Sequence, residues 1–116
     1  MNRRQTGSYY EDVAVRYLQE QQYQIVARNF RCRIGEIDII ARDREYLVFV
    51  EVKYRSSIKQ GYPAEAVTYA KQQTIYRVAA WYLQSHGYGA NTPCRFDVVS
   101  ICGQEIDLFQ NAFGGF

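Results

Sequence analysis

Two apolar runs joined by a very short polar link constrain the fold of this chain more than any other feature. Residues 35–41 combine isoleucines with alternating acidic side chains, and residues 46–53 are rich in Val and Phe. Both compositions are typical of β-strands. The link, residues 43–45, is too short for anything but a turn. The two runs are therefore predicted to form a β-hairpin.

The first strand of this hairpin has a charged face and an apolar face. Successive side chains of a strand point to opposite sides of the sheet. Glu36 and Asp38 are therefore expected to share one face, while Ile37 and Ile39 take the other. A half-charged strand of this kind is expected to border a cleft or solvent on its charged side.

The turn length predicts which residues of the hairpin face each other. A two-residue loop and a four-residue loop give the same register, in which Asp38 lies across from Glu51 and Glu36 lies across from Lys53. Facing side chains in a hairpin have Cβ atoms roughly 4.5–5.5 Å apart. A three-residue loop would shift the pairing, so the register is an inference from the turn.

Helical patterns lie on both sides of the hairpin. An amphipathic helix is expected from a cap at Thr6 or Ser8 to about Gln22, preceded by a flexible basic tail at residues 1–6. A second is expected over residues 64–85, with Trp81 in the core, and ends at His86 and Gly87. Glycine can take the left-handed cap, and histidine suits the last carbonyls.

Three further strands complete the sequence-based prediction, at residues 23–29, 96–102 and 105–109, and residues 56–63 are expected to form a loop. The resulting order is α-β-β-β-α-β-β, which indicates an α/β fold. The chain has 116 residues, so one domain covering residues 1–116 is expected.

The charged ends of the hairpin strands carry the chemistry. Two carboxylates facing each other repel, and a divalent cation between Asp38 and Glu51 would offset that repulsion. Hard oxygen ligands suit Mg²⁺ or Mn²⁺. Lys53 would place an ammonium beside the cation, where it can support a hydrolytic water or a phosphate, which favours phosphodiester hydrolysis. The alternative is a solvated salt-bridge cluster. Ile40 is expected on the same face as Asp38, and Phe49 on the same face as Glu51, and these apolar neighbours favour the wall of a cleft.

Asp38 followed by Glu51-Val52-Lys53 is similar to the PD-(D/E)xK motif of restriction-endonuclease-like nucleases, without the proline of its name. A wider set of segments resembles the YraN family of bacterial proteins, which is judged nuclease-like by similarity to archaeal Holliday-junction resolvases. These segments are Gly7-x-x-x-Glu11-x-x-Ala14, Arg28-Asn29-Phe30-Arg31-x-Arg33-x-Gly35-Glu36-Ile37-Asp38, Phe49-Val50-Glu51-Val52-Lys53-x-Arg55, Lys71, Arg95-Phe96-Asp97-Val98 and Asn111-Ala112-Phe113.

The resemblance implies a restriction-endonuclease-like fold, with a central mixed sheet flanked by helices. It also implies that Glu11 on the first helix joins Asp38 and Glu51 as a metal ligand, where an exposed helix glutamate is the alternative. Asp12 points about 100° away on a helix, so only one of the two can share the cleft. Glu36 is expected to support Lys53.

Other expectations concern the second helix and the substrate. Gln72-x-x-x-Tyr76 resembles an element of some nucleases of this superfamily, with both side chains facing the cleft; packing is the alternative. The resemblance implies DNA, in particular branched or junction DNA, as substrate and a homodimer that places two cuts symmetrically. Phe30 and Tyr54 are expected either to stack on unpaired bases or to pack.

Basic residues surround the expected site in spite of a net charge of only +2. Such side chains track phosphate backbones and make binding dependent on salt. Arg3 and Arg4 of the tail can add to them. The residues expected to contact nucleic acid are Arg28, Arg31, Arg33, Arg55, Lys59 and Lys71.

Several classes of protein are excluded by composition. Three cysteines at long spacings indicate reduced thiols in a cytoplasmic protein, not a disulfide framework or zinc site. His86 is the only histidine, which excludes a histidine-based nuclease built from this chain alone. No apolar run is long enough for a membrane span. The rivals to a nuclease are a non-cleaving nucleic-acid-binding module and a protein–protein adaptor with a vestigial acidic pocket.

Overall fold

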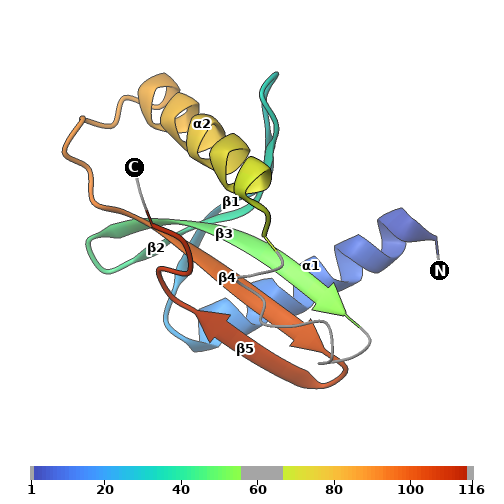
Figure 1. Cartoon of the computed structure of the whole chain (residues 1–116). Coiled ribbons are helices and arrows are strands. Elements are labelled where there is room, and N and C mark those ends of the chain that lie inside the picture. The colour runs from blue at the N-terminus through green and yellow to red at the C-terminus, as the bar shows by residue number, and fades with distance from the viewer. Residues whose placement is uncertain (1, 56–66, 115–116) are drawn as a thin grey trace.

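The computed structural model describes residues 2–55 and 67–114, and its five-stranded sheet lies between two helices (Figure 1). The strand order is β1-β2-β3-β4-β5, with β3 and β4 parallel and the other neighbours antiparallel. The predicted α/β class and element order are confirmed. The elements are α1 Arg3–Glu20, β1 Gln24–Arg31, β2 Glu36–Asp43, β3 Tyr46–Arg55, α2 Tyr69–Ser85, β4 Cys94–Cys102 and β5 Glu105–Phe109.

Helix α1 begins earlier than the sequence pattern predicted, and α2 begins at Tyr69. The cap of α1 is Asn2, whose side chain accepts from the Gln5 backbone while the Gln5 side chain accepts from Asn2, forming a capping box. The backbone from Arg3 onward is therefore helical where a tail was expected. Thr68 caps α2, accepting from the Lys71 backbone at 3.2 Å. The predicted start at residue 64, and the predicted loop at 56–63, lie outside the described residues.

The far end of α2 matches the prediction in part. His86 is its C-cap, and the His86 Nδ1 lies 3.0 Å from the Tyr82 carbonyl oxygen. Trp81, expected in the core, is 46% exposed and only flanks Phe30, with ring centroids 6.0 Å apart. No helix in the described segments is long and apolar enough to cross a membrane.

A separate core fills each side of the sheet. On the α2 side, Ile40 and Phe49 pack with Tyr82 and other buried residues. On the α1 side, Ile39 packs with Leu18 and the valines of β3. Residues on both faces of β2 and β3 are buried in these two cores, which explains why these strands form two apolar runs in the sequence.

The β2–β3 hairpin has the predicted register over most of its length. Asp43 faces Tyr46 and Ile39 faces Val50, as the short turn required. Backbone pairing of β2 with β3 ends at Ile39 and Val50, so Asp38 and Glu51 are not paired across the strands, contrary to the prediction. Instead the Val52 backbone N–H donates to Oδ2 of Asp38 at 2.8 Å. The two strands therefore separate at Asp38, and its carboxylate occupies the fork between them.

The alternation of side chains in β2 is interrupted at the same point. Ile37 packs in the α2-side core together with Ile40, whereas Ile39 packs in the α1-side core. The prediction that Ile37 and Ile39 share a face is therefore wrong. A strict two-residue period would place Asp38 in the α2-side core beside Ile40. The interruption instead leaves Asp38 at the fork.

A glycine allows α2 to pack closely against the hairpin formed by β1 and β2. A Cβ atom on Gly35 would lie 2.7 Å from Cγ2 of Thr74 and 3.5 Å from Cγ2 of Val78. The first distance is shorter than carbon atoms tolerate, so any side chain here would push the helix away. Lys71 lies about one turn before Thr74, so this close contact also holds Lys71 near the fork.

Candidate active site

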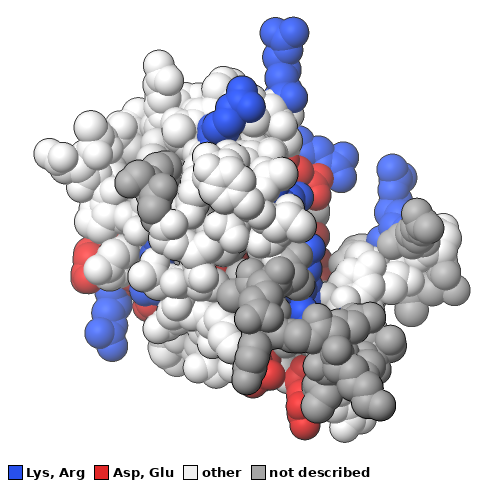
Figure 2. Space-filling model, viewed as in Figure 1, with Lys and Arg blue, Asp and Glu red and all other residues white. Residues whose placement is uncertain are grey.

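A hollow of about 720 Å³ lies where the first half of α1 meets β1, β2 and β3. Figure 2 shows basic side chains projecting at the upper right of the molecule and from the projecting end of α1, with acidic side chains visible between them. The hollow is therefore bordered by both signs of charge. Its lining residues are Arg4, Gly7, Ser8, Glu11, Asn29, Arg31, Glu36, Asp38, Val52 and Tyr54.

Asp38 is the half-buried carboxylate at the centre of the charged cluster. Burial raises the pKa of Asp38, and the hydrogen bond from the Val52 backbone opposes that rise. The Glu36 carboxylate also raises this pKa, whereas the ammonium groups of Lys71 and Lys53 lower it. One backbone donor and two ammonium groups thus offset part of the cost of burying the Asp38 charge.

Glu51 is 7% exposed on β3 and is electrostatically coupled to Asp38. Burial, and after it the charge of Asp38, together raise the pKa of Glu51 to about 7. Lys71 and Lys53 lower this pKa, and Nζ of Lys53 lies 3.9 Å from Oε1 of Glu51. The repulsion expected between Asp38 and Glu51 is therefore present, although the two residues are not ladder partners.

Glu11 approaches Asp38 from the α1 side and is 8% exposed. Its Oε1 accepts from Nδ2 of Asn29 at 2.7 Å and lies 3.4 Å from Nε of Arg28. Burial raises the pKa of Glu11, and the charge of Asp38 raises it as well. Asp12 points outward and pairs with Arg28 at 2.5 Å, so only the first of the two acidic neighbours faces the hollow.

Asn29 places its amide on Glu11 through an unusual backbone conformation. Its φ of 52° lies in the left-handed region, which asparagine tolerates better than most residues. The amide then reaches from β1 to α1, where it holds the Glu11 carboxylate. This contact was not predicted, although Asn29 belongs to the segment that resembles the YraN family.

The carboxylates are near one another but are not arranged as a three-ligand metal site. Within residues 2–55 and 67–114, no three Asp, Glu, His or Cys side chains are placed to hold a cation together. The reason is visible in the contacts: Oε1 of Glu11 is held by Asn29 and Arg28, and Glu51 does not line the hollow. Mg²⁺ commonly takes one or two protein carboxylates and completes its shell with water and substrate phosphate. The Asp38 carboxylate lines the hollow, and Glu51 is near enough for the charge of Asp38 to raise its pKa.

The predicted nucleic-acid contacts occupy different environments. Arg28 pairs with Glu11 and Asp12, and Arg31 pairs with Glu36. Glu36 therefore contacts Arg31, where support of Lys53 was expected. The remaining residues of the set are Arg33, which is exposed, Arg55 and Lys71, which are half-buried, and Lys59, which lies outside the described residues.

Gln72 and Tyr76, the two residues of the predicted second-helix element, both form hydrogen bonds to backbone carbonyls within the fold. Nε2 of Gln72 donates to the Val67 backbone carbonyl at 2.9 Å. Tyr76 is 8% exposed and packs against Phe96, and its hydroxyl donates to the Gly114 carbonyl at 2.6 Å. For Tyr76 the packing alternative is therefore correct, and the expectation that it faces the cleft is wrong.

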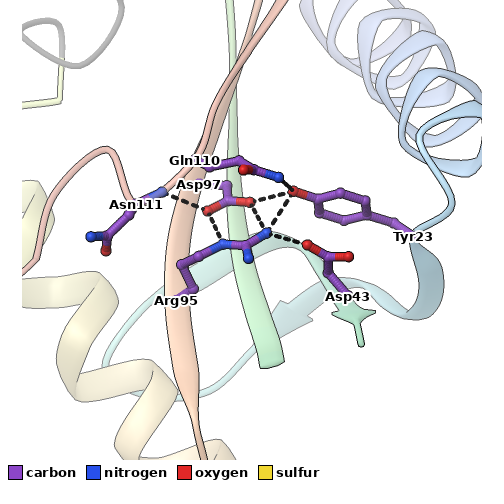
Figure 3. A network of polar contacts seen from close by, with 6 residues as sticks. All are labelled: Tyr23, Asp43, Arg95, Asp97, Gln110 and Asn111. Carbon is purple, nitrogen blue, oxygen red and sulfur yellow. Dashed lines mark hydrogen bonds and ion pairs between the residues drawn. The ribbon is translucent and has the colours of Figure 1, made fainter. Parts of the chain in front are cut away.

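A second polar network, which the sequence did not predict, lies at the opposite end of the sheet (Figure 3). Asp97 is fully buried and accepts from the Tyr23 hydroxyl at 2.7 Å, from two nitrogens of Arg95 at 2.9 Å and from the Asn111 backbone at 2.9 Å. Arg95 also donates to Asp43 at 2.8 Å. The network ties β4 to the start of β1, the end of β2 and the C-terminal segment.

The hydrogen-bonding capacity of Asp97 is satisfied by these donors. Burial raises the pKa of the Tyr23 phenol, and its hydrogen bond to Asp97 raises it too, so Tyr23 remains a donor. A charge that is fully paired has no need of a cation. This network therefore stabilises the fold, and the charged cluster around Asp38 remains the candidate active site.

Comparison with known proteins places the chain in a large group of bacterial sequences. The family model described as uncharacterised protein family UPF0102 matches residues 10–101. A UPF0102 protein of Lachnoclostridium phytofermentans is 52% identical over 116 residues, which cover 100% of this chain and 98% of that protein. A UPF0102 protein of Caldicellulosiruptor saccharolyticus is 44% identical over 119 residues, which cover 97% and 100%.

Proposed function

The chain belongs to the uncharacterised protein family UPF0102, and from its charged cluster we propose that it is a divalent-cation-dependent endonuclease that hydrolyses DNA phosphodiester bonds. The observation that carries the proposal is the coupling of Asp38 and Glu51. Burial raises the pKa of both carboxylates, and the charge of Asp38 raises the pKa of Glu51 as well. A structural ion-pair cluster would neutralise such charges, as the Arg95 network does for Asp97.

The cation would be Mg²⁺ or Mn²⁺, held by Asp38 and Glu51. When bound, it would polarise the scissile phosphate and lower the pKa of the attacking water. The Val52 backbone donates to Oδ2 of Asp38 and so orients this carboxylate, whose Oδ1 would be the oxygen offered to the cation. Glu51, which is 7% exposed, would supply the second carboxylate.

The lysines would act on the substrate phosphate. Nζ of Lys53 lies 3.9 Å from Oε1 of Glu51, so its ammonium can reach a phosphate oxygen bound next to that carboxylate. There it would stabilise the negative charge that develops during hydrolysis. Lys71 approaches the same two carboxylates from α2 and would offer a second cation to the DNA backbone. Glu11, held by Asn29, would complete the acidic site when the substrate binds.

The proposed substrate is DNA, and branched or junction DNA is the form favoured by the similarity to junction resolvases. Exposed Arg33 and the basic residues that line the hollow would follow the phosphate backbone. A homodimer would place two such sites for paired cuts. The proposed setting for this activity is the cytoplasm.

Cleavage of a labelled branched DNA in Mn²⁺ tests the proposed function. We expect wild-type protein to cut it, Asp38→Asn to lose detectable activity, and Lys53→Met to lose about 10²-fold in rate, because each removes a group that acts on the reacting phosphate. Glu105→Gln is the matched control, since Glu105 is an exposed acidic residue of β5. Equal cleavage by Asp38→Asn would disprove the assignment, and DNA binding without cutting in Mn²⁺ or Mg²⁺ would support a non-cleaving binding module.

A further inference from the structure

Three tyrosines form a continuous aromatic group at the rim of the hollow. The rings of Tyr10 and Tyr54 are stacked, with centroids 4.3 Å apart and an interplanar angle of 10°. Tyr9 meets Tyr10 edge-on at 5.2 Å and 77°. Tyr9 is 51% exposed and Tyr54 is 45% exposed. Two large aromatic side chains are thus displayed to solvent beside a charged site.

This group borders the candidate active site through Tyr54. Tyr54 lies on the same face of β3 as Val52, which also lines the hollow, and Glu11 of the neighbouring helix lines it too. Tyr54 also lines the hollow that contains Asp38. A ligand group resting on Tyr54 would therefore be a close neighbour of any phosphate held at Asp38.

The stack fixes the orientation of Tyr54. Tyr10 is half-buried and packs against the α1-side core, so it forms a firm support for the Tyr54 ring. One ring face of Tyr54 rests on Tyr10, while the residue as a whole remains 45% exposed. A ring held in this way loses little conformational freedom when a second flat group stacks on it. Packing of the hydrophobic core does not require Tyr54 to be 45% exposed.

The charges around Tyr54 indicate what that flat group is. Arg4 and Arg31 line the same hollow and are exposed, so they can pair with phosphates on either side of a stacked group. A planar aromatic group between phosphates is a nucleotide. In a continuous duplex both faces of a base are already covered by its neighbours, so only an unpaired base can stack on a protein ring.

We propose that Tyr54, backed by Tyr10, is a stacking platform for an unpaired nucleobase adjacent to the phosphate at Asp38. This inference rests on the proposed function and narrows its substrate to DNA with an unpaired nucleotide near the cut, such as a flap or an opened junction. A continuous duplex offers no base to the platform and gains only the phosphate contacts. Tyr54 thereby contributes to specificity, and the acidic site carries the chemistry.

Fluorescence anisotropy in EDTA, where no cleavage occurs, tests the platform with two labelled DNAs of equal length, one carrying a single-stranded flap and one fully paired. We expect Tyr54→Ala to weaken binding of the flap about tenfold and binding of the duplex by less than about twofold. Tyr54→Phe keeps the ring and should bind the flap as wild type does. Tyr46→Ala is the control, because Tyr46 is an exposed tyrosine at the other end of β3.

Tyr54→Leu separates stacking from packing, because leucine covers Tyr10 without offering an aromatic face. It should show the same weakened flap binding as Tyr54→Ala, with a thermal unfolding midpoint close to that of wild type. Wild-type flap binding by Tyr54→Leu or Tyr54→Ala, or an equal loss on flap and duplex, would overturn the platform while leaving the proposed nuclease intact. Wild-type protein that binds neither DNA would overturn both.

Discussion

Replacing Glu51 by glutamine is expected to stabilise the metal-free protein at pH 8 and at the same time to abolish its cleavage of DNA. Burial and the Asp38 charge raise the pKa of Glu51 from 4.5 to about 7, so at pH 8 the folded protein holds an ionised carboxylate that it disfavours. Glutamine has nearly the same shape and carries no charge. The substitution therefore removes the repulsion with Asp38, and it also removes a proposed cation ligand.

The direction of the pH dependence follows from proton linkage. Because the folded-state pKa of Glu51 is raised, the folded protein keeps this proton up to about pH 7, whereas the unfolded chain releases it near 4.5. The contribution of Glu51 to stability is therefore greatest below pH 4.5 and falls as the pH rises through this window, by on the order of 3 kcal/mol. Glutamine does not titrate, so the advantage of Glu51→Gln should be large at pH 8 and small at pH 5.

Urea unfolding in EDTA at the two pH values measures this difference. Mn²⁺ should then raise the unfolding midpoint of wild type at pH 8, because a ligand that binds only the folded state stabilises it, and should raise that of Glu51→Gln much less. Glu105→Gln, on exposed β5, should leave both properties unchanged. A Glu51→Gln protein that is less stable than wild type at pH 8 would show that Glu51 is a satisfied structural residue.

Replacing Asp97 by alanine is expected to cost about 3–5 kcal/mol of stability, the range typical of breaking a buried ion pair from one side. Asp97 is fully buried and receives hydrogen bonds from Tyr23, Arg95 and Asn111. Its loss leaves a half-buried guanidinium with Asp43 as its remaining acidic partner in the network and releases the C-terminal segment. The loss should appear as a lower urea midpoint of unfolding.

Two further variants keep this prediction testable if Asp97→Ala does not fold. Tyr23→Phe removes the hydrogen bond that Tyr23 donates to Asp97, together with those that it accepts from Arg95 and Gln110, and should cost about 1.5–3 kcal/mol. Asp107→Ala removes an exposed carboxylate of β5 and should cost less than about 0.5 kcal/mol. Stability losses below about 1 kcal/mol for both Asp97→Ala and Tyr23→Phe would contradict the role assigned to the network.

The sequence predicted the parts of the fold that depend on local patterns. The two apolar runs and their short turn were sufficient for the β2–β3 hairpin and for its register from Asp43 back to Ile39. The element order also followed from periodicity alone. The fork at Asp38 did not, because a side chain replaces a backbone partner there, and no hydrophobic pattern reports that exchange.

Contacts between segments far apart in the chain also could not be predicted from the sequence. The hydrogen bond from Tyr23 to Asp97 joins residues 74 positions apart, and the Tyr10–Tyr54 stack joins α1 to β3. Neither is visible before the elements are placed in space. Trp81 was misplaced because α2 has apolar residues around much of its circumference, and size alone does not decide which of them is covered.

The account depends on Asp38 and Glu51 binding a divalent cation together. Anomalous diffraction from a crystal soaked in Mn²⁺ at pH 8 tests this directly, because it locates the ion without reference to activity. The predicted result is one strong Mn²⁺ peak within coordination distance of the carboxylates of both Asp38 and Glu51, absent from a crystal of Glu51→Gln. Peaks only at other carboxylates, or none at the fork in a crystal that binds Mn²⁺ elsewhere, would contradict it.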